Sequence, residues 1–476
     1  MTKDFDLVIL GWGAAAFSAS IKASELTSGG AAIAMVGRGP IGGTCVNVGC
    51  VPSKYLLEAS HQVFNSLHPK MPGIAAVEAR HDFGKIMEGL RSYVDHARSL
   101  KYDKVIRNYQ NVTLIEGLGT FVDTKTVRVE NPQGRSGVEV SGSQVLVATG
   151  STPTVPMIDG LRETGFLTSD SLWGLSALPR RVAIIGGGAI GLEMGQALFH
   201  FGAEVTVVEA LDSLLPQGEP EVGEALKTRL EQEGMRFHLR ARVGSAGRSP
   251  DGKYVEVITH AGRHRVDADE IIVATGRRPN TDTLHLETAG VSTDKRGLIL
   301  TDRAMKTSSP GIYAAGDCVS KSLFLETLAA REGVVAVSNM FGQEAEIDYD
   351  SATWAVFTNP QVAGVGMTEA QFSRRNGSCA FRTLSLANLT KSTIMGETDG
   401  LIKITVDPRN NRVVGMHILS PGATDIITEG AYAVRNRYTV DDIIATSHIF
   451  PSLSEGVKLA AQSFMRDLSK MSCCVE

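Results

Sequence analysis

The segment Gly42-Gly-Thr-Cys-Val-Asn-Val-Gly-Cys-Val-Pro-Ser-Lys54 places Cys45 five residues before Cys50. In a regular helix, Cα atoms five residues apart lie about 8–9 Å from each other, whereas a disulfide allows about 7 Å at most. A bridge between the two sulfurs therefore needs a distorted turn. Gly49 relaxes the backbone between them, and Pro52 removes a donor and biases the residue before it away from the α region. A strained, reducible disulfide of this kind is what a redox catalyst needs.

Two other segments share one pattern: an apolar strand, a glycine-rich turn, a helix of small residues and a second strand. Glycines in such a turn let the backbone approach a pyrophosphate, which is held by the N–H groups at the helix N-terminus. Each segment is therefore predicted to open a dinucleotide-binding domain. The first comprises Phe5 to Leu10, Gly11 to Ala16 and Ala31 to Val36, and the second comprises Arg181 to Ile185, Gly186 to Gly191 and Glu204 to Val208.

Repeated strand endings mark the expected domain boundaries. Val145 to Gly150 and Ile271 to Gly276 are apolar runs that close on Ala-Thr-Gly, and a proline-containing connector follows each. From about Tyr349 onward, alternating apolar residues predict an antiparallel sheet, with helices over Ala423 to Asn436 and Ser454 to Leu468. We expect an α/β fold with two Rossmann-like nucleotide-binding domains and a C-terminal α+β domain. The predicted segments are 1–152, 153–276, 277–346 and 347–476, of which the first and third form one domain.

Bulk composition narrows the class of protein. The chain of 476 residues is 43% hydrophobic and 21% charged, with a net charge of -5, which is typical of a globular enzyme of several domains. No dense Lys/Arg run offers a footprint for a nucleic acid, and the apolar stretches are far shorter than the roughly 20 residues needed to cross a bilayer. Six cysteines in so long a chain do not form a secreted disulfide framework. We expect a cytoplasmic protein that binds neither nucleic acid nor membrane.

The residue that ends the second strand of each glycine segment discriminates between nucleotides. Glu209 stands about 20 residues after the second set of glycines, where a carboxylate accepts the 2′-OH of NAD and repels the 2′-phosphate of NADP. No Arg follows it until Arg229, so NADH is expected in preference to NADPH. In the first segment, Gly37-Arg38 stands where an acid would contact a ribose. That contact is expected to come from the backbone or from a later residue.

The segment around Cys45 and Cys50 resembles the redox-active segment shared by dihydrolipoamide dehydrogenase, glutathione reductase and mercuric reductase, which are two-cysteine flavoprotein disulfide reductases. The resemblance covers nearly the whole chain. Thr301 to Asp317 resembles the family's second FAD motif, and Val356 to Val362 resembles the start of its dimerisation domain. The resemblance implies an FAD-binding domain over 1–152 and 277–346, an NAD(P)-binding domain over 153–276, and a dimerisation domain over 347–476 that forms a homodimer.

By the same resemblance, Cys45 is the interchange thiol that faces substrate and Cys50 is the thiol against the flavin. Lys54 is expected near the isoalloxazine and paired with Glu193, because an ammonium lowers the pKa of a nearby thiol and needs a counter-charge when it is buried. Asp317 is expected to contact the ribityl chain. The residues assigned to cofactor binding are Gly11, Gly13, Ala16, Gly43, Thr44, Thr149, Gly150, Gly186, Gly188, Gly191, Glu209, Gly276, Gly316 and Asp317.

The end of the chain distinguishes subfamilies. Disulfide-reducing members carry His-Pro-Thr-x-x-Glu, whose His is the acid-base for the leaving thiol, whereas Phe450-Pro-Ser-Leu-Ser-Glu455 stands here. His448, two residues earlier, is expected to point elsewhere. The apolar residue and the terminal pair Cys473-Cys474 resemble mercuric reductases, and two soft thiolates bind a soft metal ion. Ser452 is a departure, because mercuric reductases have a Tyr directly after the Pro and a longer loop.

These features predict NAD(P)H-dependent reduction of Hg(II) to Hg(0), with Hg(II)-thiol complexes as substrate. The alternatives are an NADH-dependent disulfide reductase of the dihydrolipoamide dehydrogenase type and a protein that sequesters metal without turnover. Cys318 is expected to be buried beside the flavin site and Cys379 to be incidental. The catalytic residues are predicted to be Cys45, Cys50, Lys54, Glu193 and Glu455, and the metal-binding residues Cys45, Cys50, Cys473 and Cys474.

Overall fold

The computed structural model describes residues 3–77, 79–130 and 137–471, and the chain divides into two compact units. Unit 1 comprises Met1–Ser53, Met87–Thr154 and Gly276–Asp348, and unit 2 comprises Lys54–Ile86, Val155–Thr275 and Tyr349–Glu476. The assignment of cofactors to domains 1–152, 153–276, 277–346 and 347–476 stays a prediction. Helices α3 (Cys50–Leu67) and α4 (Phe83–Arg98) each begin in one unit and end in the other.

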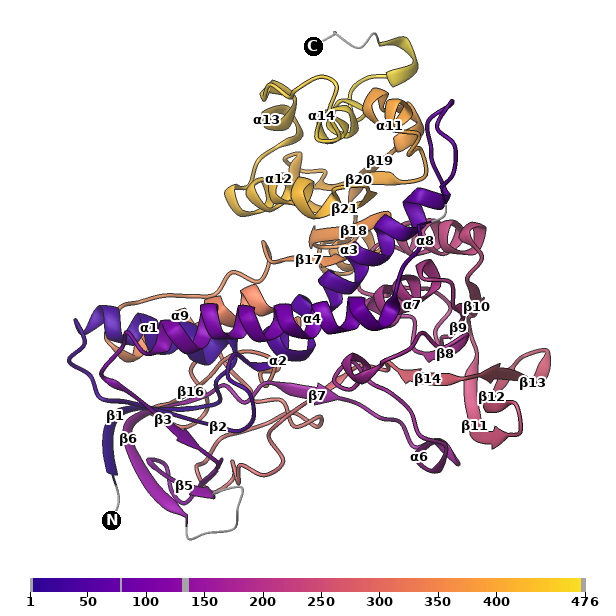
Figure 1. Cartoon of the computed structure of the whole chain (residues 1–476). Helices are drawn as coiled ribbons and strands as arrows, with labels where there is room; N and C mark the ends of the chain where they lie inside the picture. The colour runs from indigo at the N-terminus through magenta and orange to yellow at the C-terminus, as the bar shows by residue number, and fades with distance from the viewer. Residues whose placement is uncertain (1–2, 78, 131–136, 472–476) are drawn as a thin grey trace. The chain divides into compact units, whose positions relative to one another are not determined.

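Unit 1 is built on a sheet with the strand order β3-β2-β1-β6-β5-β4, and β16 pairs with β6. Strands β1 and β2 are parallel and joined by α1, as the first glycine segment predicts. Their apolar residues are buried in a continuous run, as in strands covered on both faces. Helix α1 packs against α9 (Figure 1). The elements are β1 (Lys3–Leu10), α1 (Ala14–Leu26), β2 (Ile33–Gly37), α2 (Gly43–Val48), α5 (Lys104–Ile106), β3 (Val112–Glu116), β4 (Leu118–Phe121), β5 (Thr126–Glu130), β6 (Val138–Val147), β7 (Ser151–Pro153), β15 (Arg277–Pro279), β16 (Ile312–Ala314) and α9 (Glu326–Met340).

The second glycine segment opens the corresponding part of unit 2. Its parallel sheet has the order β10-β9-β8-β14, and an antiparallel sheet has the order β11-β12-β13. Apolar residues of both sheets share one core, so the two sheets pack as one body. The elements are α6 (Leu161–Thr164), β8 (Arg181–Ile185), α7 (Ala189–His200), β9 (Glu204–Val208), α8 (Pro220–Glu233), β10 (Arg236–His238), β11 (Arg242–Ser249), β12 (Gly252–Thr259), β13 (Gly262–Ala268) and β14 (Glu270–Val273).

The C-terminal part of unit 2 is the predicted antiparallel sheet with helices. Its strand order is β17-β18-β21-β20-β19, and its core lies between this sheet, α12 and α14. Helix α12 has the predicted bounds. The elements are β17 (Thr353–Val356), β18 (Gln361–Gly366), α10 (Glu369–Asn376), β19 (Ala380–Ser385), α11 (Thr390–Met395), β20 (Leu401–Asp407), β21 (Arg412–Ser420), α12 (Ala423–Asn436), α13 (Val440–Ala445) and α14 (Glu455–Gln462).

Helix α14 is shorter than predicted, because the helix expected to reach Leu468 ends at Gln462. Arg382 explains the early end. Its Nε donates to the carbonyl of Ser463 at 3.0 Å, and its guanidinium lies over the ring of Phe464. A carbonyl at the helix end is thus satisfied by a side chain from a distant strand, and the following residues leave the helix.

Lys403 on β20 anchors the C-terminal sheet. Its side chain is completely buried, and its Nζ donates to Glu219, Glu221 and Glu369 at 3.1, 2.9 and 3.0 Å. These hydrogen bonds outweigh burial and raise the pKa of Lys403. The buried ammonium therefore stays charged, with its three carboxylates around it.

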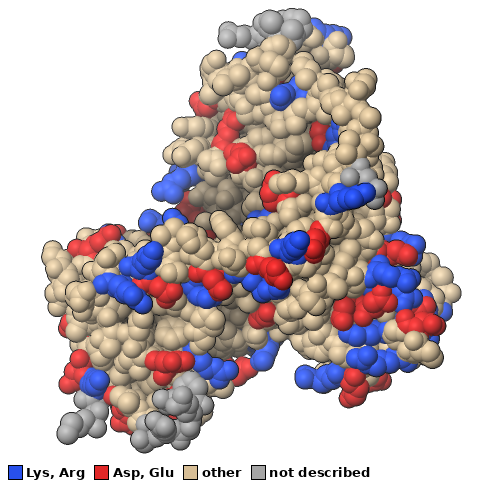
Figure 2. All heavy atoms as spheres, in the orientation of Figure 1, with Lys and Arg blue, Asp and Glu red and all other residues tan. Residues whose placement is uncertain are grey.

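None of the described helices combines the length and the apolar character that crossing a membrane requires. On the face drawn in Figure 2, Lys and Arg side chains alternate with Asp and Glu side chains over much of the surface. Positive and negative side chains are therefore intermixed on this face and are not separated into patches of one charge.

Candidate active site

The segment between Cys45 and Cys50 is a helix break, as the spacing of the cysteines predicts. Helix α2 ends at Val48, Gly49 has φ -116° and ψ -112°, and α3 begins at Cys50. A Cβ on Gly49 would lie 3.0 Å from a backbone oxygen of the preceding helix, so a side chain does not fit there. The expectation for Pro52 is wrong: the residue before it is helical, because Pro52 lies in the first turn of α3, where no donor is needed.

Cys45 and Cys50 are free cysteines whose side chains interact with each other. The hydrogen bond with Cys50 raises the pKa of the Cys45 thiol well above its usual value, and burial and the charges of Cys50 and Glu326 add to the effect. Cys45 is half-buried and Cys50 is exposed. The neutral form of the Cys45 thiol is therefore favoured over its thiolate.

Tyr102 also belongs to this site, and no sequence pattern pointed to it. It lies on a π-helical turn, Ser99–Asp103, directly after α4, a distortion that is frequent at functional sites. Its ring packs edge-on against Phe17 at 4.9 Å and contacts the turn at Gly42. Burial raises the pKa of Tyr102, and the proximity of Glu326, Cys45 and Cys50 adds to the rise.

Lys54 and Glu193 form the predicted pair. Lys54 Nζ lies 2.6 Å from a carboxylate oxygen of Glu193 and 4.4 Å from the centre of the Phe357 ring. The other oxygen of Glu193 accepts from the backbone N–H of Phe357 at 2.9 Å. Only 6% of the Glu193 side chain is exposed. Because one of its oxygens pairs with Lys54 and the other accepts from Phe357, the carboxylate is fixed and holds the Lys54 ammonium in place.

The first glycine turn fits a dinucleotide. Gly11 has φ +124°, and a Cβ on it would overlap the Ala148 carbonyl. Gly13 begins α1 without a side chain, so the N–H groups of the first turn are uncovered. Thr149 has a buried hydroxyl oxygen that finds no partner among the described residues. An open helix N-terminus beside an unsatisfied hydroxyl is what a bound pyrophosphate and ribose would complete.

The other residues assigned to the first nucleotide surround this turn. Gly43 has φ +67°, and a Cβ on it would lie 2.6 Å from the Cα of Gly13, so the redox segment packs directly on the turn. Ala16 is buried. Thr44 lies on α2 next to Cys45. Gly150 and Gly276 have positive φ and open space around them.

Trp12 explains why no acid follows the second strand of the first segment. A Cβ on Gly37 would overlap the indole ring of Trp12. The ring thus fills the space in which an acidic side chain would begin. The sequence shows that the acid is missing. The contact between Trp12 and Gly37 that explains it is not predictable from the sequence, because the two residues are 25 positions apart.

Asp317 is held by a short chain of polar contacts. Ser151 Oγ donates to Asp317 at 2.6 Å and accepts from Arg277 Nε at 2.7 Å. Burial raises the pKa of Asp317, while Ser151 and the charge of Arg277 oppose that rise. Gly316, next to it, donates its N–H to the buried Glu332 at 2.6 Å. The carboxyl group of Asp317 is therefore fixed, as a hydrogen-bonding partner of a polyhydroxyl chain needs to be.

The second glycine turn has the same geometry in unit 2. Gly186 has φ +113°, Gly188 precedes α7 with open space where a Cβ would lie, and a Cβ on Gly191 would overlap the Gly186 carbonyl. Glu209 accepts from the N–H groups of Gly187 at 2.6 Å and Leu211 at 2.8 Å. Two backbone donors fix its carboxylate, which retains acceptor capacity for a hydroxyl group.

The Phe450–Glu455 segment presents no imidazole where disulfide reductases have one. Phe450 is 47% exposed. His448 is held by Glu429 at 2.8 Å, and this hydrogen bond raises the pKa of His448.

Burial raises the pKa of Glu455, and one of its oxygens has no hydrogen-bond partner within residues 3–77, 79–130 and 137–471. Ser452 Oγ accepts from the Glu455 N–H at 3.2 Å.

Of the four other cysteines, the structure describes Cys318 and Cys379. Cys473 and Cys474 lie outside the described residues. Cys318 is fully buried, its thiol contacts backbone carbonyls, and burial raises its pKa to about 12. Cys379 contacts the hydroxyl of Ser373.

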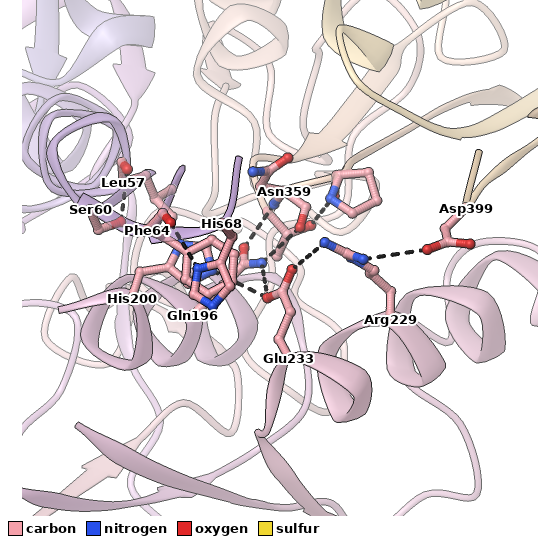
Figure 3. A network of polar contacts seen from close by, with 12 residues as sticks. Leu57, Ser60, Phe64, His68, Gln196, His200, Arg229, Glu233, Asn359 and Asp399 are labelled. Carbon is pink, nitrogen blue, oxygen red and sulfur yellow. Dashed lines mark hydrogen bonds and ion pairs between the residues drawn. The ribbon is translucent and has the colours of Figure 1, made fainter. Parts of the chain in front are cut away.

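A buried polar network joins α7 and α8 to the C-terminal part of unit 2 (Figure 3). Gln196 donates to the carbonyl of Asn359 at 2.8 Å and accepts from its N–H at 2.8 Å. Glu233 contacts both Gln196 and His200. His200 stacks on Phe64 of α3, with ring centroids 3.9 Å apart. The network begins one helical turn beyond Glu193 and therefore helps to fix the helix that carries it.

The chain resembles known proteins over nearly its whole length. Residues 5–333 match the family model described as pyridine nucleotide-disulphide oxidoreductase, and residues 352–461 match the model of its dimerisation domain. A mercuric reductase from Lysinibacillus sphaericus is 37% identical over 471 residues, 99% of this chain and 84% of the relative. One from Streptomyces lividans is 36% identical over 471 residues, 99% of this chain and 98% of the relative.

Two solved structures have the same fold. LpdA from Mycobacterium tuberculosis is 26% identical with a TM-score of 0.86, and the match covers 98% of this chain and 100% of that chain. The Cu(II) complex of the HOCl-induced flavoprotein disulfide reductase RclA from Escherichia coli is also 26% identical, with a TM-score of 0.84 and the same coverage.

Proposed function

Because the chain belongs to the pyridine nucleotide-disulphide oxidoreductase family, we propose that it reduces Hg(II) to Hg(0) with electrons from NADH. Membership of this family makes the protein a flavoprotein oxidoreductase that uses FAD and a nicotinamide cofactor. The proposal concerns the acceptor, the preference for NADH and the residues that take part. It draws on the full-length likeness to mercuric reductases and on the residues of the site.

The main support for Hg(II) as the acceptor is the phenyl side chain of Phe450. Reduction of a disulfide needs an acid-base group for the leaving thiol, and Phe450 stands where the imidazole would be. His448 does not replace it, because its Nε2 is committed to Glu429. A metal ion that accepts electrons needs sulfur ligands but no proton shuttle. The absence of the imidazole is therefore compatible with the reduction of Hg(II), whereas it would slow the reduction of a disulfide.

In the proposed mechanism, FAD supplies two-electron transfer between the nicotinamide and the sulfur pair. The open N-terminus at Gly13 would hold the pyrophosphate of FAD, and Asp317 would hold its ribityl chain. Cys45 and Cys50 bind Hg(II), since mercury is a soft ion that prefers thiolate ligands. Lys54, one helical turn after Cys50 on α3, provides positive charge that stabilises thiolate, and Glu193 holds it in place.

The terminal pair Cys473 and Cys474 is proposed to capture Hg(II)-thiol complexes and to pass the ion to Cys45 and Cys50. We propose a homodimer, supported by the dimerisation-domain match over residues 352–461, in which the tail of one subunit serves the other. Thiols that must stay reduced favour a cytoplasmic location.

Glu209 supports the preference for NADH. Its carboxylate is held by two backbone N–H groups and is positioned to accept a ribose hydroxyl, while its charge repels a 2′-phosphate. We expect kcat/KM for NADH to exceed that for NADPH, and the replacement Glu209→Ser to narrow the difference. Equal use of both cofactors by the wild type would contradict this part of the proposal.

The decisive experiment compares electron acceptors. NADH oxidation is measured with Hg(II)-thiol complexes and with lipoamide, for the wild type and for the variant with both Cys473 and Cys474 replaced by Ala. Mercury-dependent turnover is expected in the wild type and a selective loss of it in the variant. Rapid lipoamide turnover without mercury-dependent oxidation would identify the alternative, a dihydrolipoamide dehydrogenase-like reductase, which Glu209, Glu193 and the short loop favour.

A further inference from the structure

Two histidines from different sheets of unit 2 meet at its surface. His238 is the last residue of β10, and His264 lies on β13. Their Nε2 atoms are 3.4 Å apart, their ring centroids are 4.5 Å apart, and the contact is exposed. The pair plays no part in the function proposed above.

Both histidines are held by regular strand pairing. His238 pairs with Val208 in the parallel sheet, and its carbonyl accepts from the N–H of Glu209 at 2.8 Å. His264 pairs with Val257, a completely buried residue of the antiparallel sheet. The two backbones are therefore fixed before any ligand arrives, which lowers the entropy cost of binding one.

The separation of the two nitrogens matches one coordination geometry. Zn²⁺ binds imidazole nitrogen at about 2.0–2.1 Å and prefers a tetrahedral arrangement, so two ligand nitrogens on one ion lie about 3.3–3.4 Å apart. Neighbouring ligands in a square-planar site lie closer, at about 2.8–2.9 Å. Burial and the proximity of His264 lower the pKa of His238, which favours the neutral imidazole that binds metals.

We propose that His238 and His264 form a binding site for a tetrahedral divalent cation of the Zn²⁺ type. Within the described residues, no third His, Cys, Asp or Glu completes a cluster with this pair. Water molecules or a small ligand from solution therefore fill the other two positions. Because the ligands come from two sheets, a bound ion cross-links β10 and β13.

The first test is a Zn²⁺ titration of the oxidised enzyme by calorimetry. The wild type is compared with His238→Ala and His264→Ala, and with His260→Ala, an exposed histidine in the turn before β13, as the matched control. All four proteins carry the same cysteines, so binding to thiols cancels in the comparison. We expect each single variant of the pair to bind one equivalent of Zn²⁺ fewer than the wild type, and the control to bind the same amount.

A second measurement needs only the wild type and so does not depend on the folding of a variant. Diethylpyrocarbonate modifies accessible imidazoles, and mass spectrometry of peptides locates the modified residues. Zn²⁺ is expected to protect His238 and His264 together and to leave His260 reactive. Equal Zn²⁺ stoichiometry in all four proteins, or unprotected His238 and His264, would overturn the proposal and leave the pair as a hydrogen bond between two rings.

Discussion

Trp12 lies against Gly37, so that the indole ring fills the space in which a side chain at the end of β2 would begin. The glycine turn and the strand end are thus coupled. A bulky residue between the two glycines of the turn requires the absence of a side chain at position 37. The ribose contact that an acid would provide there is therefore excluded by packing.

We expect Gly37→Glu to weaken FAD retention and to destabilise the protein by about 1–3 kcal/mol, as overpacking does. The double variant Trp12→Gly with Gly37→Glu removes the ring that causes the overlap and is expected to recover both properties. FAD release measured by fluorescence and urea unfolding provide the two readouts. Arg38→Glu, at an exposed neighbouring position, is the control. A double variant no better than Gly37→Glu would show that the Trp12 ring is not the obstacle.

Loss of the ammonium of Lys54 leaves the buried carboxylate of Glu193 with one backbone donor. We expect Lys54→Met to cost about 1.5–3 kcal/mol, the usual value of a hydrogen bond to a charged group. Glu193→Gln keeps the bond to the Phe357 N–H and should cost less. A double-mutant cycle in urea measures the coupling, expected at about 0.5–3 kcal/mol. Lys85→Met, at an exposed position on α4, should change little; strictly additive costs would argue against the pairing.

The histidines near α7 make stability depend on pH. Burial and the proximity of His200 lower the pKa of His61 to about 4, below its value of about 6.5 in an unfolded chain. Between these values the unfolded state binds more protons, so the free energy of unfolding falls as pH falls from about 6.5 to 4. We expect His61→Leu to remove as much as about 3 kcal/mol of this dependence. Urea titrations at several pH values measure it, with the exposed His96→Gln as control. An unchanged pH slope in His61→Leu would contradict the assignment.

Lys403 is the cation that three carboxylates share, and its replacement is expected to be severe. Lys403→Met should cost about 3–5 kcal/mol, because the buried carboxylate of Glu219 loses its cationic partner. Without the ammonium, the three carboxylates repel one another, and protonation of the folded variant relieves that repulsion. The folded variant then binds extra protons as pH falls, so its deficit should shrink between pH 7 and 5. Adding Glu219→Gln should recover part of the loss; a deficit that grows towards acid pH would refute this explanation.

An imidazole at position 450 should restore disulfide chemistry. General acid-base catalysis contributes roughly 10²–10⁴-fold, so Phe450→His is expected to raise lipoamide turnover at least about tenfold and to leave mercury-dependent turnover unchanged. Ile449→His, which places the imidazole on the exposed preceding residue, is the matched control. If both variants gain equally, position 450 has no special access to the leaving thiol.

The sequence predicted features that depend on local pattern. Both glycine turns, their flanking strands, the helix break at Gly49 and helix α12 follow from residues close together in the chain. The contact of Trp12 with Gly37, the place of Tyr102 beside the thiols and the backbone partners of Glu209 depend on segments that meet only in the folded protein. The same holds for the end of α14, where the deciding residue is Arg382, 81 positions from the carbonyl that it binds.

The break at Gly49 also makes the two sulfurs electrically unlike. Cys50 opens an 18-residue helix, whose first N–H groups carry a partial positive charge of about half a unit, while Cys45 lies inside the preceding short helix. The helix N-terminus therefore favours the thiolate of Cys50, whereas the hydrogen bond with Cys50 and burial raise the pKa of Cys45. The proposed chelation of Hg(II) needs both sulfurs as thiolates, so binding by the pair is expected to become tighter as pH rises.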